Sequence, residues 1–121
     1  MNNEKDNVYD LVEDFYAHDE GWNTLLRQEY AEGFLRMEAW KGKKNSDLYR
    51  SWDNLTMLCL YLGSAETFLG DMNADDFIDC IAWCGRNISE FTPDYKNTQD
   101  FLETCDGLFK YLKGKNAISN D

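Results

Sequence analysis

The residues that could carry catalysis are few, and the first of them is a lone histidine. Nucleophilic catalysis of the Ser-His-Asp or Cys-His type needs a histidine as its base, and the chain contains one, His18. It lies in the polar run 17–20 (AHDE), directly before Gly21, and we interpret it as a solvated residue near a helix end. The eight glycines complete no Walker or Rossmann phosphate-binding loop. We therefore expect that the protein is not an enzyme.

Four cysteines are the next candidates for chemistry: Cys59, Cys80, Cys84 and Cys105. Cys80 and Cys84 are four residues apart, so one helix face would present both thiols. A structural zinc site needs two further nitrogen or sulfur ligands, and the apolar neighbours of all four cysteines favour ordinary packing as reduced thiols in a cytoplasmic protein. The sequence predicts no metal, no cofactor and no disulfide framework.

An acidic run partly resembles a calcium-binding loop. Residues 71–75 (DMNAD) have the ligand spacing of the first half of an EF-hand. The sixth position of that loop needs glycine and is Asp76, and the twelfth needs a bidentate glutamate and is Ala82. Both departures remove geometry on which the ion depends, so we expect a solvated acidic surface here.

Charge gives the strongest signal about partners. The chain has 12 basic and 23 acidic residues and a net charge of −11 at pH 7, which argues against a nucleic-acid or anionic-membrane binder. The bases gather at two places, a group of candidate nucleic-acid contacts around a polar connector and a group near the end of the chain: Lys41, Lys43, Lys44 and Arg50, and Lys110, Lys113 and Lys115. If the two groups meet in the fold they form one basic patch; otherwise they serve helix ends and solubility.

Three large side chains are candidates for a protein interface. Trp83 lies off the apolar stripe of its helix, and Met57 and Tyr61 flank the stripe of another. Tryptophan, tyrosine and methionine are enriched at interfaces when they are exposed. The alternative is that the first helix or a linker covers them.

The elements that must position these residues are helices. Hydrophobic residues recur with helical spacing nearly everywhere, and one proline in 121 residues leaves few chain breakers. We expect five helices: one around Val8 to Phe15 behind Asp6, one from Trp22 to Trp40, one from Asp47 to Leu62 between Ser46 and Gly63, one from the cap Asn73 to Ile88, and one from Asn97 or Thr98 to Gly114. The third is apolar almost all round in its last turns, which predicts the most central position. The fold class is all-α, a compact bundle of about five helices in a single domain, 1–121.

Three stretches share their spacing with one family. They are the third helix with Leu48-Tyr49, Trp52, Leu55, Leu58 and Tyr61-Leu62, the helix start 73–78 (NADDFI), and the last run with Thr98, Phe101-Leu102, Leu108-Phe109, Tyr111-Leu112, Gly114, Ile118 and Asn120. In this pattern the chain from about residue 29 to 121 resembles the N-terminal SAM-like, or core-binding, domain of tyrosine recombinases and phage integrases. The resemblance implies a four-helix core that forms half of a clamp around DNA. No residue matches the catalytic arginines, histidine and tyrosine of that family, so it implies no strand cleavage.

Three functional hypotheses follow. The first is a non-catalytic helical binding module that mediates protein–protein interaction, with another protein or with itself. The second is a DNA-binding domain related to phage integrases, and the third is an acidic decoy of a nucleic-acid-binding protein. The longest apolar stretch, Leu55 to Gly63, is about half the length of a membrane span, so we expect no membrane partner and a cytoplasmic location.

Overall fold

Five α-helices make up the part of the chain that the structure describes. The computed structural model describes residues 8–18, 28–66, 71–88, 91–92 and 94–115, and these form α1 (Val8–His18), α2 (Gln28–Trp40), α3 (Asn45–Ala65), α4 (Ala74–Asn87) and α5 (Tyr95–Gly114). No strand occurs among them, which confirms the predicted all-α bundle. The predictions for Asp6, Trp22, Ile118 and Asn120 concern residues outside these ranges.

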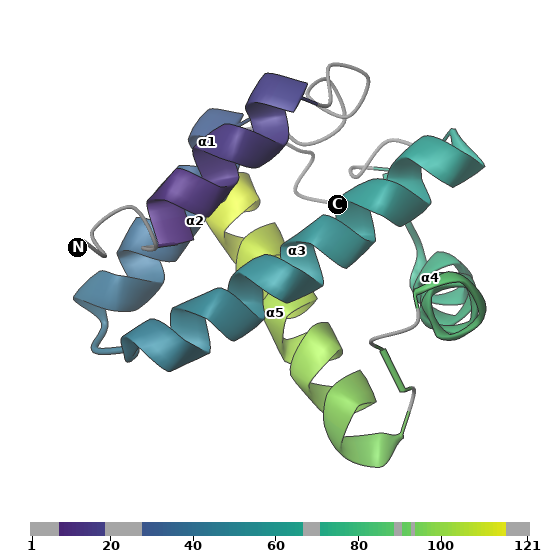
Figure 1. Cartoon of the computed structure of the whole chain (residues 1–121). Helices are drawn as coiled ribbons and strands as arrows, with labels where there is room; N and C mark the ends of the chain where they lie inside the picture. The colour runs from purple at the N-terminus through teal and green to yellow at the C-terminus, as the bar shows by residue number, and fades with distance from the viewer. Residues whose placement is uncertain (1–7, 19–27, 67–70, 89–90, 93, 116–121) are drawn as a thin grey trace.

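Helix α3 is the centre of the bundle, as its composition predicts. It contacts α1, α2, α4 and α5, and Figure 1 shows it crossing the middle of the molecule with α1 and α2 on one side and α4 on the other. Leu55, Leu58, Cys59 and Leu62 are fully buried along it. Met57 and Tyr61 are also buried, to one side of this stripe, so α3 can receive neighbours from more than one direction.

The ends of α3 differ from the prediction. The helix begins at Asn45 after the N-cap Lys44, and it ends at Ala65 with Glu66 in the left-handed conformation (φ 54°), so the expected limits at Ser46 and Gly63 are wrong. A glycine inside a helix costs about 1 kcal/mol relative to alanine, and the additional turn offsets this because the Glu66 N–H bonds the carbonyl of Leu62.

The start of α4 follows the prediction, and the start of α5 does not. Asn73 and Asp76 form a reciprocal capping box at α4, with Asp76 N–H to Asn73 Oδ1 at 3.0 Å and Asn73 N–H to Asp76 Oδ2 at 2.9 Å. Helix α5 begins at Tyr95, before the expected Asn97 or Thr98, because the Asp94 carboxylate accepts the Asn97 N–H at 2.8 Å and acts as the N-cap. Asp94 thereby fixes the first turn of α5.

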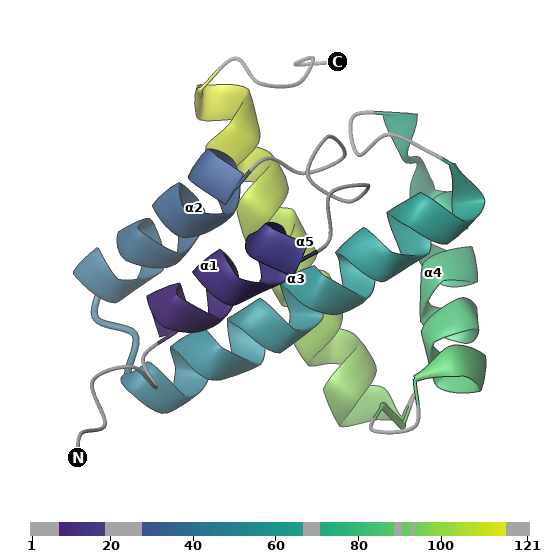
Figure 2. The same ribbon diagram turned by 45° about the horizontal axis from the view of Figure 1, so that its top comes forward.

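Helix α5 is seated by close contacts with α2 and α4. A Cβ built on Gly33 of α2 would meet the hydroxyl of Tyr111 on α5, so the absence of a side chain at Gly33 permits this approach. Phe77 of α4 and Phe109 of α5 pack edge to face, with ring centroids 5.4 Å apart. Figure 2 shows the C-terminal part of α5 beside α2, while its other end lies next to the lower end of α4. None of the helices within the described ranges is long and apolar enough to cross a membrane.

Candidate functional site

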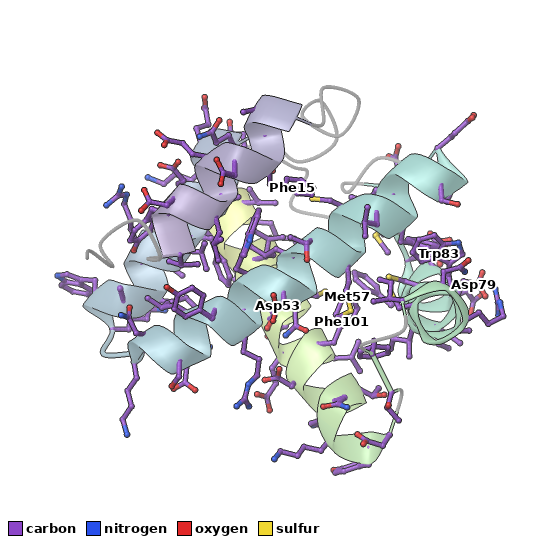
Figure 3. The ribbon with its side chains drawn as sticks, viewed as in Figure 1. Phe15, Asp53, Met57, Asp79, Trp83 and Phe101 are labelled. Carbon is purple, nitrogen blue, oxygen red and sulfur yellow. The ribbon has the colours of Figure 1, made fainter. Side chains whose placement is uncertain are left out.

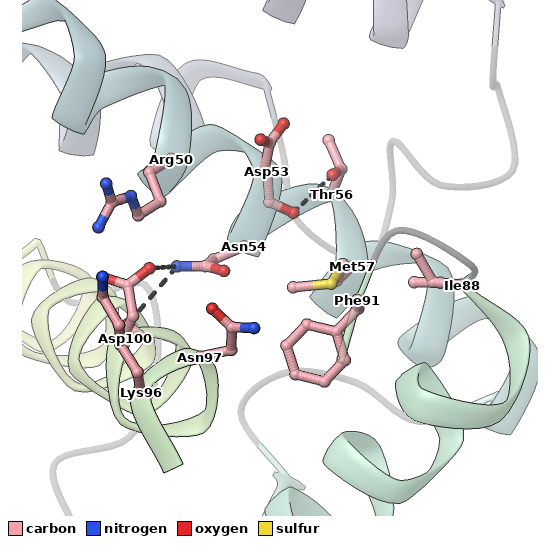
Figure 4. A pocket seen from close by; sticks show the side chains of 10 residues that line it. All are labelled: Arg50, Asp53, Asn54, Thr56, Met57, Ile88, Phe91, Lys96, Asn97 and Asp100. Atoms are coloured by element: carbon pink, nitrogen blue, oxygen red, sulfur yellow. Dashed lines mark hydrogen bonds between the residues drawn. The ribbon is translucent and has the colours of Figure 1, made fainter. Parts of the chain in front are cut away.

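A hollow of about 570 Å³ lies between α3 and the first turns of α5. We call it the α3–α5 groove. It is lined from α3, from the connection after α4 and from α5 by Arg50, Asp53, Asn54, Thr56, Met57, Ile88, Phe91, Lys96, Asn97 and Asp100. Cavities of roughly 300–1,000 Å³ hold small-molecule ligands, so the groove has the size of a binding site (Figure 4).

Helix spacing brings the polar and apolar parts of the groove into line. Arg50, Asn54 and Met57 follow each other at intervals of four and three residues, so they lie on one face of α3. Lys96 and Asp100 are four residues apart on α5 and form the opposite side. This first part of α5 is held by its cap and by the hydrogen bond from Asn97 Nδ2 to the carbonyl of Thr92, at 2.9 Å.

Asn54 is the central polar residue of the groove, and only 5 % of its surface is exposed. Its Nδ2 donates to Asp100 Oδ2 at 3.1 Å and to Thr104 Oγ1 at 2.9 Å. These bonds fix the orientation of the amide, because the flipped amide would place its oxygen against the Asp100 carboxylate. Its Oδ1 points into the hollow (Figure 4) and accepts no hydrogen bond from any residue that the structure describes.

One end of the groove is apolar. Met57 is buried, and Ile88 and Phe91 are half-buried around it. Phe91 is supported from behind by Phe101, with ring centroids 6.4 Å apart, and its N–H bonds the carbonyl of Ile88 at 3.0 Å. This wall offers an apolar surface next to the Asn54 oxygen.

The other end of the groove carries charge. Arg50 and Lys96 are exposed and form no ion pair within the described part of the chain, and Asp100 lies between them and accepts from Asn54. Asp53 lies at the rim and points away from Asp100 (Figure 4). Partial burial of its carboxyl raises the pKa of that group. The Arg50–Lys96 end therefore has two cations for one anion.

The residues predicted to contact nucleic acid lie at the α2–α3 turn, and only Arg50 of these reaches the groove. Lys41 and Lys44 are exposed, whereas Lys43 is held by Glu38 Oε1 at 3.0 Å and by Ser51 Oγ at 3.4 Å. Lys110 and Lys115 instead line a shallow hollow with Arg36 of α2. The α2–α3 turn and the C-terminal part of α5 lie at opposite ends of α2 (Figure 2), so the two basic groups do not form one patch.

The three predicted interface residues are not an exposed surface. Met57 and Tyr61 are each only 8 % exposed, so for these two residues the alternative that they are covered holds. Trp83 is half-buried and packs edge to face on Tyr61, with ring centroids 6.0 Å apart, and Figure 3 shows it where α4 faces α3. Helix α4 covers the flank of α3, which the periodicity of α3 alone does not reveal.

The four cysteines are buried free thiols. A hydrogen bond between Cys80 and Cys84 raises the pKa of Cys80 and lowers that of Cys84. Burial raises the pKa of Cys59 to about 12, and its hydrogen bond with Tyr16 acts in the opposite direction. In the described ranges no three histidine, cysteine or acidic side chains lie where they could hold a metal ion. The backbone of His18 ends α1.

Sequence reasoning missed Asn54 and the α5 side of the groove. One signal was available for Asn54, because a polar residue in the middle of a helix that is apolar on several sides must find a polar partner. That partner, Asp100, lies 46 residues further along the chain.

The chain was compared with protein-family models, with curated proteins and with solved structures. None of them matches it.

Proposed function

We propose that this chain is a helical binding module whose α3–α5 groove holds a segment of a partner polypeptide. The observation that carries the proposal is the buried side chain of Asn54, whose Oδ1 faces the hollow and accepts no hydrogen bond from the described residues. Because the hollow opens to solvent, water can donate to this oxygen. A ligand that brings an N–H can take the place of that water.

A polypeptide matches the mixed chemistry of the groove. Its backbone offers N–H donors to Asn54 and carbonyl acceptors to Arg50 and Lys96, and its side chains offer apolar groups to Met57 and Phe91. Arginine, methionine and phenylalanine are also among the residues enriched at protein interfaces. The exposed rim side chains show that the groove opens to solvent, so a long chain can enter and leave it.

Selection from a random peptide display library tests this proposal. The bait is the full chain, and the variant Asp53→Trp places a large side chain at the exposed rim of the groove. The matched control is Glu103→Trp, which removes the same charge from an exposed position of α5 outside the groove. We expect selected peptides to bind the wild-type chain and the control equally and to bind Asp53→Trp at least tenfold more weakly. Failure to select any peptide, or equal binding to both variants, would contradict the proposal.

A second candidate function is nucleic-acid binding at the α2–α3 turn, and the observation that favours it is Trp40. This side chain is 86 % exposed and is followed by the exposed Lys41 and Lys44. Aromatic rings that stack on bases beside cations that contact phosphates are the common device of single-strand binders. The resemblance to core-binding domains supports a nucleic-acid ligand in general terms, and the net charge of −11 opposes it.

Fluorescence anisotropy with labelled single-stranded and duplex DNA, at roughly 50 and 200 mM salt, tests the second candidate. Binding that falls steeply with salt and is abolished by Lys41→Glu with Lys44→Glu, and by Trp40→Ala, would support it. The control is Arg86→Glu, which changes an exposed cation on α4. Lack of binding at low salt, or binding that the turn variants leave unchanged, would refute it.

A further inference from the structure

We propose that the occupant of the α3–α5 groove is the carboxyl-terminal residue of a polypeptide, with a large apolar side chain. This inference rests on the proposed binding function and specifies its ligand. It assigns one contact to each of three groups on a single residue: the backbone N–H to Asn54 Oδ1, the side chain to the apolar wall, and the terminal carboxylate to the cations Arg50 and Lys96.

The order of the receiving groups along α3 supports a single residue as the ligand. Arg50, Asn54 and Met57 lie on one face of α3 within a segment of eight residues, and the helix rises about 10 Å from the first to the last. Asn54 is in the middle, so the group that meets its oxygen lies between a charged end and an apolar end (Figure 4). In an amino-acid residue the N–H, the carboxylate and the side chain are all attached to one Cα, so a single residue can offer all three groups within this length.

The hydrogen-bond donor must come from the ligand. The two N–H groups of the Asn54 amide are directed at Asp100 and Thr104, which leaves its oxygen as the acceptor that faces the hollow. A backbone N–H is such a donor, whereas a fatty acid or a hydrocarbon has none. The ligand is therefore apolar at one end and also carries a hydrogen-bond donor, which in a polypeptide is the backbone N–H.

The charges at the other end select an anion. Arg50 comes from α3 and Lys96 from α5, neither is engaged in an ion pair within the described residues, and the single carboxylate between them, Asp100, already accepts from Asn54. Asp53 points away from this end (Figure 4). The groove as a whole is lined by two cations and two carboxylates, so the excess of positive charge is local to the Arg50–Lys96 end. There an arginine can hold a carboxylate through two parallel hydrogen bonds. Capture of a terminal carboxylate is an established mode of peptide recognition.

The size of the groove favours a polypeptide over a free amino acid. A hollow of about 570 Å³ exceeds what one amino acid fills, and its rim is exposed. The residues that precede the terminal one therefore have room to leave toward solvent. A free amino acid would also bring an ammonium group close to Arg50 and Lys96.

Isothermal titration of the full chain with peptides tests this assignment. The probes are a tetrapeptide Ala-Ala-Ala-Leu with an acetylated N-terminus, the same peptide as its C-terminal amide, the same peptide with an N-methyl group on the leucine nitrogen, and free leucine. We expect the free-acid peptide to bind, the amide and the N-methyl peptide each to bind about tenfold more weakly, and free leucine to bind weakest. Free leucine binding as tightly as the peptide would overturn the choice of a polypeptide.

Two charge variants link the preference to the residues. Arg50→Gln with Lys96→Gln changes exposed side chains, and it should make the free acid and the amide bind equally. The control pair Lys41→Gln with Lys44→Gln removes the same charge outside the groove and should preserve the preference. A preference that survives the Arg50 and Lys96 changes would overturn the carboxylate assignment.

The display selection distinguishes peptide binding in the groove from recognition of a carboxyl-terminal residue. The library is presented once with free carboxyl termini and once with the random segment followed by a fixed tail. Peptides that bind the groove equally well in both formats, with loss in Asp53→Trp, would refute the terminal-residue assignment and leave the binding module intact. Groove binding by free-terminus peptides alone would support both, and no groove binding in either format would refute both.

Discussion

The contact between Gly33 and Tyr111 gives a prediction whose sign depends on the structure. Gly33 lies inside α2, and an alanine in a helix interior is about 1 kcal/mol more favourable than a glycine. On helix propensity alone, Gly33→Ala should stabilise the protein by that amount. A Cβ at Gly33 would overlap the hydroxyl of Tyr111, however, and would lie 3.0 Å from its Cζ.

The overlap reverses the expected sign. The ring of Tyr111 packs on Phe34, with centroids 6.2 Å apart, so it cannot move without loss of contacts, and overpacking of this kind costs about 1–3 kcal/mol. The net change for Gly33→Ala is therefore a loss of about 1 kcal/mol of unfolding free energy. In a Tyr111→Phe background the hydroxyl is gone, and the same change should be neutral or stabilising by up to about 1 kcal/mol.

Urea unfolding followed by tryptophan fluorescence measures all four members of this double-mutant cycle. We expect a coupling free energy of about 1–2 kcal/mol between the two positions. Gly114→Ala is the control, because nothing lies within 4 Å of a Cβ at that position near the end of α5. If Gly33→Ala stabilises the wild-type protein by about 1 kcal/mol, α5 is not seated on α2 as described, and the groove that this seating positions is in doubt.

Three further predictions concern other parts of the fold. Gly42 has a φ of +104° with open space around it, so Gly42→Ala should cost about 1–2 kcal/mol from backbone strain alone, and thermal unfolding that is unchanged would contradict this. Asn73→Ala removes the capping bond to Asp76 and should cost about 1 kcal/mol, as measured by urea unfolding; Asn87→Ala, at the other end of α4, should cost less. The pKa of Cys59 rises from 9.0 to about 12 in the folded protein, so the native thiol keeps its proton when the unfolded thiol loses it. The contribution is present below pH 9 and is lost as the pH rises from 9 toward 12, at up to about 1.4 kcal/mol per pH unit. Unfolding in alkali should show a smaller slope for Cys59→Ala, and an identical slope would refute the assignment.

The helices and their core could largely be predicted from the sequence, because helical periodicity is a local property. The stripe Leu48, Leu55 and Leu62 predicts the buried side of α3, and all three residues are buried. The ends of helices were less predictable. Lys44 precedes α3 without a side-chain cap, and Asp94 acts as an N-cap where Asn97 and Thr98 offer equally suitable residue types. A choice among neighbouring capping residues depends on which bonds form, and composition does not decide it.

The candidate site was only partly predictable, because it is formed by segments distant in the chain. Arg50 and Met57 were singled out for different reasons, as a nucleic-acid contact and as an interface residue, and the structure places both in one groove. The orientation of the Asn54 amide depends on its hydrogen bonds to Asp100 and Thr104, and no local sequence pattern connects these residues to Asn54. The burial of Met57 and Tyr61 likewise depends on where α4 packs against α3. Periodicity identifies faces of helices, and tertiary packing decides which faces meet.

The most direct test of the account is to map where a selected peptide binds, by chemical-shift perturbation in a labelled sample of the full chain. We expect the largest changes at the Asn54 side-chain amide, the Met57 methyl group and the Phe91 ring, which line the α3–α5 groove. The Trp40 indole, which is exposed at the end of α2, should remain unchanged. Changes centred on Trp40 and its neighbouring lysines, with the resonances of Asn54 and Met57 unmoved, would contradict it.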